Sequence, residues 1–119
     1  VIILSDTFYE FSGPLMKQLD YPTLFCHQLI IDSKGSIVDF RLRQEDQKTK
    51  AVKALQGLNF KVISAGDSYN DIGMLKQADA GILFCPPESV IKEFPIFPVA
   101  HSYHEFELLL LAAREKLLG

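Results

Sequence analysis

Short apolar runs alternate along the chain with segments in which apolar residues recur at helical spacing. The runs at residues 1–5 and 60–65 predict buried strands, and those at residues 80–84 and 97–100 predict a short strand and a last short extended piece. Helices are predicted between and after them, over residues 12–19, 46–57, 70–78, 87–94 and 102–119. Alternation of this kind favours parallel pairing of the strands and an α/β fold.

One segment breaks the alternation. Residues 24–42 hold two β-rich runs on either side of "DSKG", in which Asp32 and Gly35 supply turn chemistry. We therefore predict a three-layer, Rossmann-like α/β core with a mostly parallel sheet and an inserted β-hairpin.

Three helix starts carry capping signals. Ser12 is a candidate N-cap with Pro14 in the first turn, and Asp46 is a candidate N-cap for the next helix. Ser102 and Glu105 form a capping-box pattern before the last helix.

Composition limits the number of domains and the kinds of partner. A chain of 119 residues, 48% hydrophobic, suits one domain over residues 1–119. The net charge is −3 and no basic run occurs, which argues against a nucleic-acid partner. No apolar run approaches the ~20 residues that span a bilayer, so we expect a soluble, cytoplasmic protein. No feature of the sequence indicates an oligomeric state.

The first residues suggest that the chain continues a longer protein. It begins without methionine, inside the apolar run "VIIL". We therefore expect a C-terminal fragment.

Polar residues follow two of the predicted strands. Ser5, Asp6 and Thr7 come after the first, and "GDSYND", residues 66–71, comes after the strand at 60–65. Ligands of parallel sheets bind beyond the carboxyl ends of the strands, so we expect both segments at one rim. Hydroxyl, backbone N–H and carboxylate groups there could hold a phosphate and Mg²⁺, with Asp67 as a metal ligand.

Simpler interpretations exist for both segments. Ser68 and Asp71 match a capping box, although this leaves Asp67 unexplained, and two crowded carboxylates are relieved best by a cation. Ser5, Asp6 and Thr7 could equally cap the next helix or solvate a loop.

Lys48 is unusually placed for a surface lysine. It lies in the first turn of a predicted helix, where the helix dipole disfavours a cation unless an anion is bound nearby. We expect its side chain to be exposed and to contribute little to stability, like those of Lys50 and Lys53. The three histidines lack metal-ligand spacing and are assigned no role: His27, His101 and His104.

The order of these motifs resembles the haloacid dehalogenase superfamily of phosphotransferases. "ILSDTFYEFSGPLMKQL", "RQEDQKTKAV", "AGDSYNDIGML" and "AGILFCPPESVIKEFP" are similar to its phosphoserine phosphatase branch, including bifunctional members that also transfer the phosphoryl group to homoserine. The resemblance implies a Mg²⁺-dependent phosphatase or phosphotransferase of serine biosynthesis that acts on phosphoserine through an aspartyl-phosphate.

The resemblance also implies roles for individual residues. Lys48 and Asp67 would be catalytic, and Asp67 and Asp71 would form the metal site. The phosphate and substrate would be bound by Ser5, Asp6, Thr7, Lys48 and Asn70.

One element of the family is missing from these residues. Its nucleophile is an aspartate followed two positions later by a second acid, whereas Asp6 is followed at that distance by Phe8. The helical cap that selects the substrate is also missing. The chain therefore resembles the C-terminal part of the core.

Two other interpretations of the sequence exist, and the missing nucleophile favours the first of them. The first is a non-catalytic or truncated core that serves as a binding or interaction module. The second, a receiver domain, needs an acidic pair at the end of its first strand and an alternation without a hairpin, and both features are missing here.

Overall fold

The computed structural model describes all 119 residues, which form two compact units, Val1–Gln47 and Lys48–Gly119. Each unit contains one three-stranded sheet, covered by one helix in the first unit and by several in the second. The predicted α/β class is confirmed. The assignment of residues 1–119 to a single domain stays a prediction.

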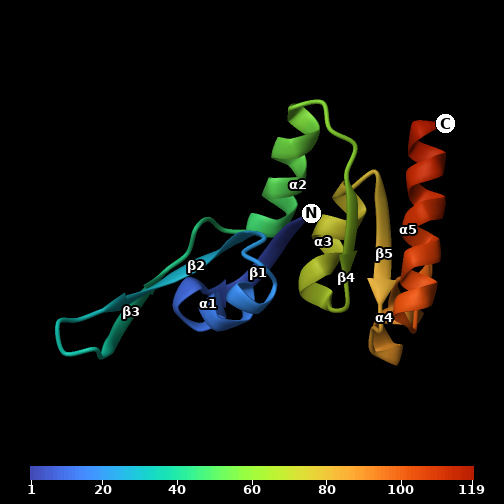
Figure 1. The fold of residues 1–119 in the computed structure, drawn as a ribbon. Coiled ribbons are helices and arrows are strands. Elements are labelled where there is room, and N and C mark those ends of the chain that lie inside the picture. Colours follow the sequence, from blue (N-terminus) through green and yellow to red (C-terminus); the bar gives the residue numbers. More distant parts are fainter. The chain divides into compact units, whose positions relative to one another are not determined.

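The first unit consists of a parallel strand pair extended by a hairpin. Its elements are β1 (Ile2–Phe8), α1 (Tyr9–Gln18), β2 (Thr23–Ile31) and β3 (Ile37–Arg41). The strand order is β1-β2-β3, with β1 parallel and β3 antiparallel to β2. The helix packs on β1 and β2 (Figure 1). It buries Met16, and Cys26 of β2 is 1% exposed. The predicted hairpin is confirmed.

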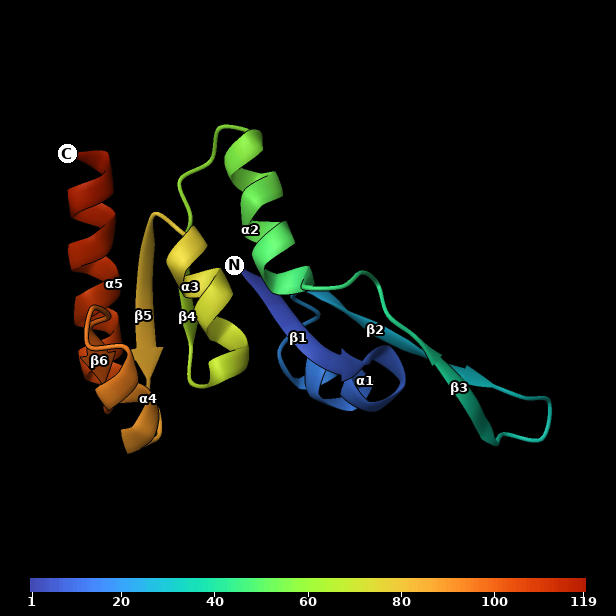
Figure 2. The same ribbon diagram turned by 180° about the vertical axis from the view of Figure 1, so that it is seen from behind.

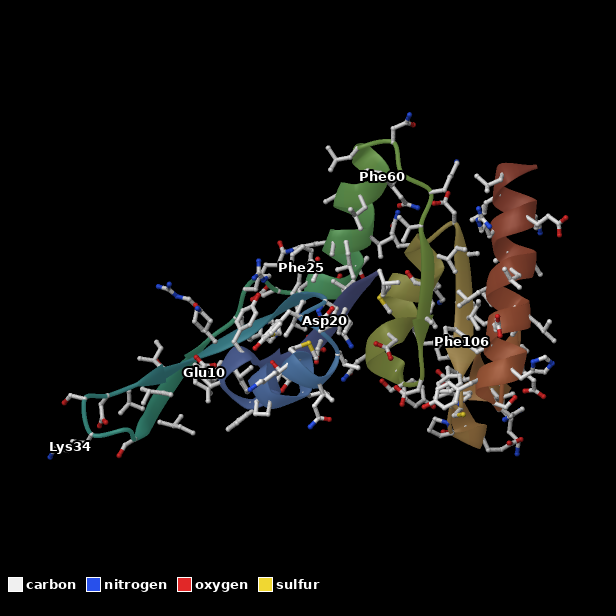
Figure 3. The ribbon with its side chains drawn as sticks, in the orientation of Figure 1. Glu10, Asp20, Phe25, Lys34, Phe60 and Phe106 are labelled. Carbon is white, nitrogen blue, oxygen red and sulfur yellow. The ribbon has the colours of Figure 1, made fainter.

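Asp32 organises the hairpin turn. Its Oδ1 accepts hydrogen bonds of 2.9 Å from the N–H groups of Lys34 and Ser36, and its own N–H donates to the Ser36 carbonyl. Gly35 has a φ of +82°, which a residue with a Cβ adopts at a cost. Lys34 lies at the tip of the hairpin (Figure 3).

The start of α1 differs from the prediction. The strand β1 continues to Phe8, and α1 begins at Tyr9, three residues before the predicted cap Ser12. Ser12 is instead buried inside the helix, where its hydroxyl donates to the Phe8 carbonyl at 3.0 Å, and Pro14 lies in the second turn. The prediction failed because pairing with β2 extends β1 beyond its apolar run.

The second unit contains the remaining elements. They are α2 (Gln47–Gly57), β4 (Ile63–Gly66), the 3₁₀ turn η1 (Tyr69–Asp71), α3 (Ile72–Gln77), β5 (Ala80–Phe84), α4 (Glu88–Glu93), β6 (Val99–Ala100) and α5 (Tyr103–Leu118). The first residue of α2, Gln47, belongs to the first unit.

A parallel sheet between helices forms the second unit. The strand order is β4-β5-β6, with all neighbours parallel. Helix α3 covers one face and α5 covers the other (Figures 1 and 2). Phe106 of α5 points toward β5 (Figure 3), and its ring centroid lies 5.2 Å from that of Phe84. The largest fully buried apolar side chains of this unit are those of Val52, Leu75, Ile82, Leu83 and Val90.

Two predicted caps have different outcomes. Ser102 Oγ accepts a hydrogen bond of 3.2 Å from the Glu105 N–H, so the cap of α5 is confirmed. Asp46 precedes α2 with a φ of +49° instead of the extended backbone usual at an N-cap.

The strand β4 is shorter than its apolar run. It starts at Ile63, because the Val62 N–H donates to the Asp79 carboxylate at 2.8 Å before the ladder with β5 begins. No helix of the protein combines the length and the apolar character needed to cross a membrane.

Candidate phosphate and metal site

The turn after β4 is built around the carboxylate of Asp71. Its Oδ2 accepts hydrogen bonds from the N–H groups of Asp67 and Ser68, at 3.0 and 3.3 Å, and lies 3.4 Å from Ser68 Oγ. The predicted pairing of Ser68 and Asp71 is therefore present. Asp71 closes the turn in which Asp67 and Asn70 also lie.

Lys48 is the second partner of Asp71. Its Nζ donates to Asp71 Oδ1 at 2.7 Å, and the side chains are only 14% and 8% exposed. The expectation that Lys48 is a solvated surface lysine is therefore wrong. The ion pair accounts for a cation in the first turn of α2, because Asp71 offsets the unfavourable helix dipole.

The surroundings of Asp71 favour its ionised form. Burial raises the pKa of this carboxyl group, but hydrogen bonds from Lys48 and from the Asp67 N–H, together with the Lys48 charge, outweigh burial and lower the pKa below its ordinary value. Asp71 is therefore a buried anion at neutral pH that fixes the Lys48 ammonium near the carboxyl end of β4.

Gly66 permits the close approach of Asp71, a role that the sequence analysis missed. A Cβ at this position would lie 2.5 Å from Cβ, Cγ and Oδ2 of Asp71. Any side chain would therefore displace the carboxylate or the backbone. A glycine directly before the first acid of "GDSYND" was the available signal.

Asp67 and Asn70 lie in the same turn. Both residues are exposed, and the Asp67 carboxylate accepts no hydrogen bond from the protein. An exposed carboxylate without a protein partner fits a hard divalent cation, which binds oxygen ligands and retains several waters. The structure contains no group of three or more His, Cys, Asp or Glu residues that could hold a metal ion by itself.

Ser5, Asp6 and Thr7 lie within β1, not after it. Ser5 Oγ accepts a hydrogen bond of 3.2 Å from the Thr7 N–H, so its hydroxyl proton can be donated elsewhere. None of the three caps α1, whose N-cap is Phe8 without a side-chain hydrogen bond. The convergence of this segment with the turn after β4 stays a prediction.

Two polar side chains of the first unit were also missed. His27 and Gln47 are 5% and 3% exposed and both contact Asp6. The sequence offered no signal, because His27 lies in a strand and Gln47 at a helix start, and neither matches a ligand spacing.

No protein-family model matches the chain, but two curated proteins are similar to all or nearly all of it. The phosphoserine phosphatase ThrH of Pseudomonas aeruginosa is 54% identical over 119 residues, which are 100% of this chain and 58% of that protein. A phosphoserine phosphatase of Pseudomonas syringae pv. tomato is 52% identical over 118 residues, 99% of this chain and 50% of that protein. The chain thus spans about half the length of the curated relatives that it matches.

Solved structures share the fold. A phosphoserine phosphatase in apo form is 25% identical, has a TM-score of 0.64, and is matched over 78% of this chain and 49% of that chain. A phospho-aspartyl intermediate analogue of phosphoserine phosphatase has a TM-score of 0.65 at 24% identity, over 83% of this chain and 49% of that chain. The predicted resemblance to phosphoserine phosphatases is confirmed, and the chain matches about half the length of such proteins.

Proposed function

We propose that the full-length protein containing residues 1–119 removes the phosphoryl group of phosphoserine in a Mg²⁺-dependent reaction through an aspartyl-phosphate. The nucleophilic aspartate would lie outside these residues. The observation that carries the proposal is the buried pair of Lys48 and Asp71, set beside the exposed, unpartnered carboxylate of Asp67. The similarity to two proteins named phosphoserine phosphatase supports the substrate.

Lys48 would stabilise negative charge on the phosphoryl group. Asp71 holds its ammonium in one place through a 2.7 Å hydrogen bond. A preorganised cation near the carboxyl end of a strand needs no reorganisation when charge develops in the transition state.

Asp67 would hold the Mg²⁺. We assign Asp71 to fixing Lys48 and the turn instead, because both of its oxygens already accept hydrogen bonds from the protein. When bound, Mg²⁺ would supply electrostatic stabilisation of the phosphoryl oxygens and orient the phosphate.

The nucleophilic aspartate would lie at the end of a further strand that pairs with β4. In its own sheet β4 is an edge strand, because its only strand partner is β5. A further parallel strand on this edge would end at the same rim and place its acid near Asp67. Ser5 would donate its hydroxyl proton to a phosphoryl oxygen.

The phosphoryl group would pass to water or to an acceptor alcohol. Transfer to homoserine, a place in serine biosynthesis and a cytoplasmic location belong to the same proposal and rest on the resemblance of the motifs.

Phosphate release from phosphoserine by the full-length protein tests the proposal. We expect turnover with Mg²⁺, none with EDTA, recovery when Mg²⁺ is restored in excess, and none from residues 1–119 alone. Homoserine in the assay should yield a phosphorus NMR signal of phosphohomoserine. Turnover by residues 1–119 that is lost in Asp67→Asn would mean that the nucleophile is misplaced.

A non-catalytic binding module is the alternative, favoured by the lack of an acidic pair after an apolar strand. Such a protein would bind inorganic phosphate with Mg²⁺, measured by calorimetry, yet release none from phosphoserine. Turnover by the full-length parent would exclude it.

A further inference from the structure

At Ser5–Thr7, strand β1 has more residues than the stretch of β2 that lies opposite. Leu4 of β1 lies opposite Phe25 of β2, and Phe8 lies opposite His27. Three residues of β1 therefore face the single residue Cys26, which makes Ser5–Thr7 a bulge with two extra residues. Residues that leave the ladder lose its hydrogen bonds, so other partners must fix their conformation.

Two buried side chains supply these partners. Gln47 Nε2 donates to the Ser5 carbonyl and, at 3.3 Å, to Asp6 Oδ1. His27 Nε2 lies 3.3 Å from the same Asp6 oxygen. The bulge is thus held at its main chain and at its middle side chain by groups that solvent barely reaches.

The orientation of the His27 ring is itself fixed. Its Nδ1 accepts a hydrogen bond of 2.9 Å from the Arg43 N–H, so Nδ1 carries no proton. The proton is therefore on Nε2, which donates to Asp6. Arg43 is anchored in turn by a 3.3 Å hydrogen bond from its Nε to the Cys26 carbonyl.

One atom of Gln47 is left without a partner. Its Oε1 is buried and has no hydrogen-bond partner in the protein, which destabilises the folded state. An apolar side chain of similar size would avoid this orphaned acceptor. What Gln47 provides is its Nε2 donor, directed at the bulge.

We propose that His27 and Gln47 are positioning residues that act on the reaction through the Ser5–Thr7 bulge. They would hold the bulge so that the Ser5 hydroxyl is directed at a phosphoryl oxygen, without contacting the substrate themselves. The inference rests on the proposed function, in which Ser5 binds the phosphate.

A double-mutant cycle in the full-length protein tests it. The values of kcat/KM for phosphoserine are measured for the parent, His27→Leu, Ser5→Ala and the double variant. We expect His27→Leu to lower kcat/KM by about 10-fold or more, but by less than about 3-fold when Ser5 has already been replaced by alanine, because coupled residues are not additive. Equal losses in both backgrounds would overturn the inference.

Two further variants separate positioning from stability. His27→Gln keeps an N–H donor on a similar reach to Asp6 and should recover most of the loss, which also covers the case in which His27→Leu does not fold. Met16→Ala removes a buried side chain of α1, and its effect on kcat/KM should be the same in the parent and in the Ser5→Ala background. Coupling as strong for Met16→Ala as for His27→Leu would overturn the inference.

Hydrogen exchange provides a readout that does not need activity. We expect the amides of residues 5–7 to exchange at least about 10-fold faster in His27→Leu than in the parent, because the bulge loses a partner. If the parent shows no turnover, the proposed function fails, and the exchange result still decides whether His27 holds the bulge. Unchanged exchange in a folded His27→Leu protein would overturn the inference even if activity falls.

Discussion

Lys48 Nζ lies 2.7 Å from Asp71 Oδ1, and this pair joins the first turn of α2 to the turn that follows β4. Both side chains are largely buried, and the other Asp71 oxygen accepts two backbone N–H groups of the turn. The carboxylate that orders the turn thus also fixes the cation beside it. Stability and the proposed chemistry are therefore coupled at this position.

Lys48→Ala should lower both activity and stability. Removal of the ammonium leaves the buried Asp71 carboxylate without its cation, at a cost on the order of 3 kcal/mol in the free energy of unfolding. Urea unfolding measures this cost and phosphate release measures the activity. Lys50→Ala and Lys53→Ala are matched controls, because both lysines are exposed, and they should stay within about 0.5 kcal/mol of the parent. A Lys48→Ala protein as stable as these controls would contradict the role of the pair.

Acid should lower the free energy of unfolding, because it protonates Asp71. Its pKa is lower in the folded state than in the unfolded state, so its contribution is complete above the unfolded value of about 3.9 and is lost as the pH falls through the folded pKa. Unfolding free energies measured from pH 6 downward should therefore fall more steeply for the parent than for Asp71→Asn.

Asp79 needs its own control in this experiment. Hydrogen bonds from the Val62 N–H and the Gln56 side chain also lower the pKa of Asp79. Asp79→Asn should keep the part of the acid dependence that Asp71 causes. Parallel pH profiles for the parent and Asp71→Asn would show that Asp71 is not responsible.

Asp67→Asn and Ser68→Ala should distinguish cation binding by Asp67 from helix capping by Ser68. The Asp67 carboxylate is exposed and unpartnered, so its replacement should leave stability in EDTA unchanged, while the rise in melting temperature with Mg²⁺ and the turnover are lost. Ser68→Ala, beside it, loses a 3.4 Å contact and should cost at most about 1 kcal/mol while keeping the Mg²⁺ response. Melting temperatures in EDTA measure the stability of each variant, and the shift with saturating Mg²⁺ measures its response to the cation. An Asp67→Asn protein that still responds to Mg²⁺ would remove Asp67 from the metal site.

Gly66→Ala should destabilise the protein by about 2 kcal/mol or more. The added Cβ would lie 2.5 Å from the Asp71 carboxylate and displace it from Lys48 or from the turn. Gly13→Ala is the matched control, because nothing lies within 4 Å of its added Cβ inside α1, and it should raise stability by about 0.5–1 kcal/mol. Thermal unfolding measures the stability of both variants. Equal changes in stability for Gly66→Ala and Gly13→Ala would show that the close approach of Asp71 does not constrain residue 66.

Much of the fold could be predicted because its signals are local. The run at residues 80–84 coincides with β5, the turn residues Asp32 and Gly35 lie between β2 and β3, and Ser102 caps α5. Each of these depends on residues a few positions apart, which a sequence pattern displays directly. The residues of the turn after β4 were found in the same way, because "GDSYND" is one continuous stretch.

Only the tertiary structure decided how these residues are used. Lys48 is 23 positions from Asp71 in the sequence, so no local pattern predicts that it is buried and paired. The bulge at Ser5–Thr7 depends on the register with β2, and the use of His27 depends on Arg43 and Asp6, which lie in other segments. The sequence determined which polar groups are available and on which elements they lie. Burial, ion pairing and hydrogen-bond direction arise from contacts between distant segments, and these set the charge and position of each group.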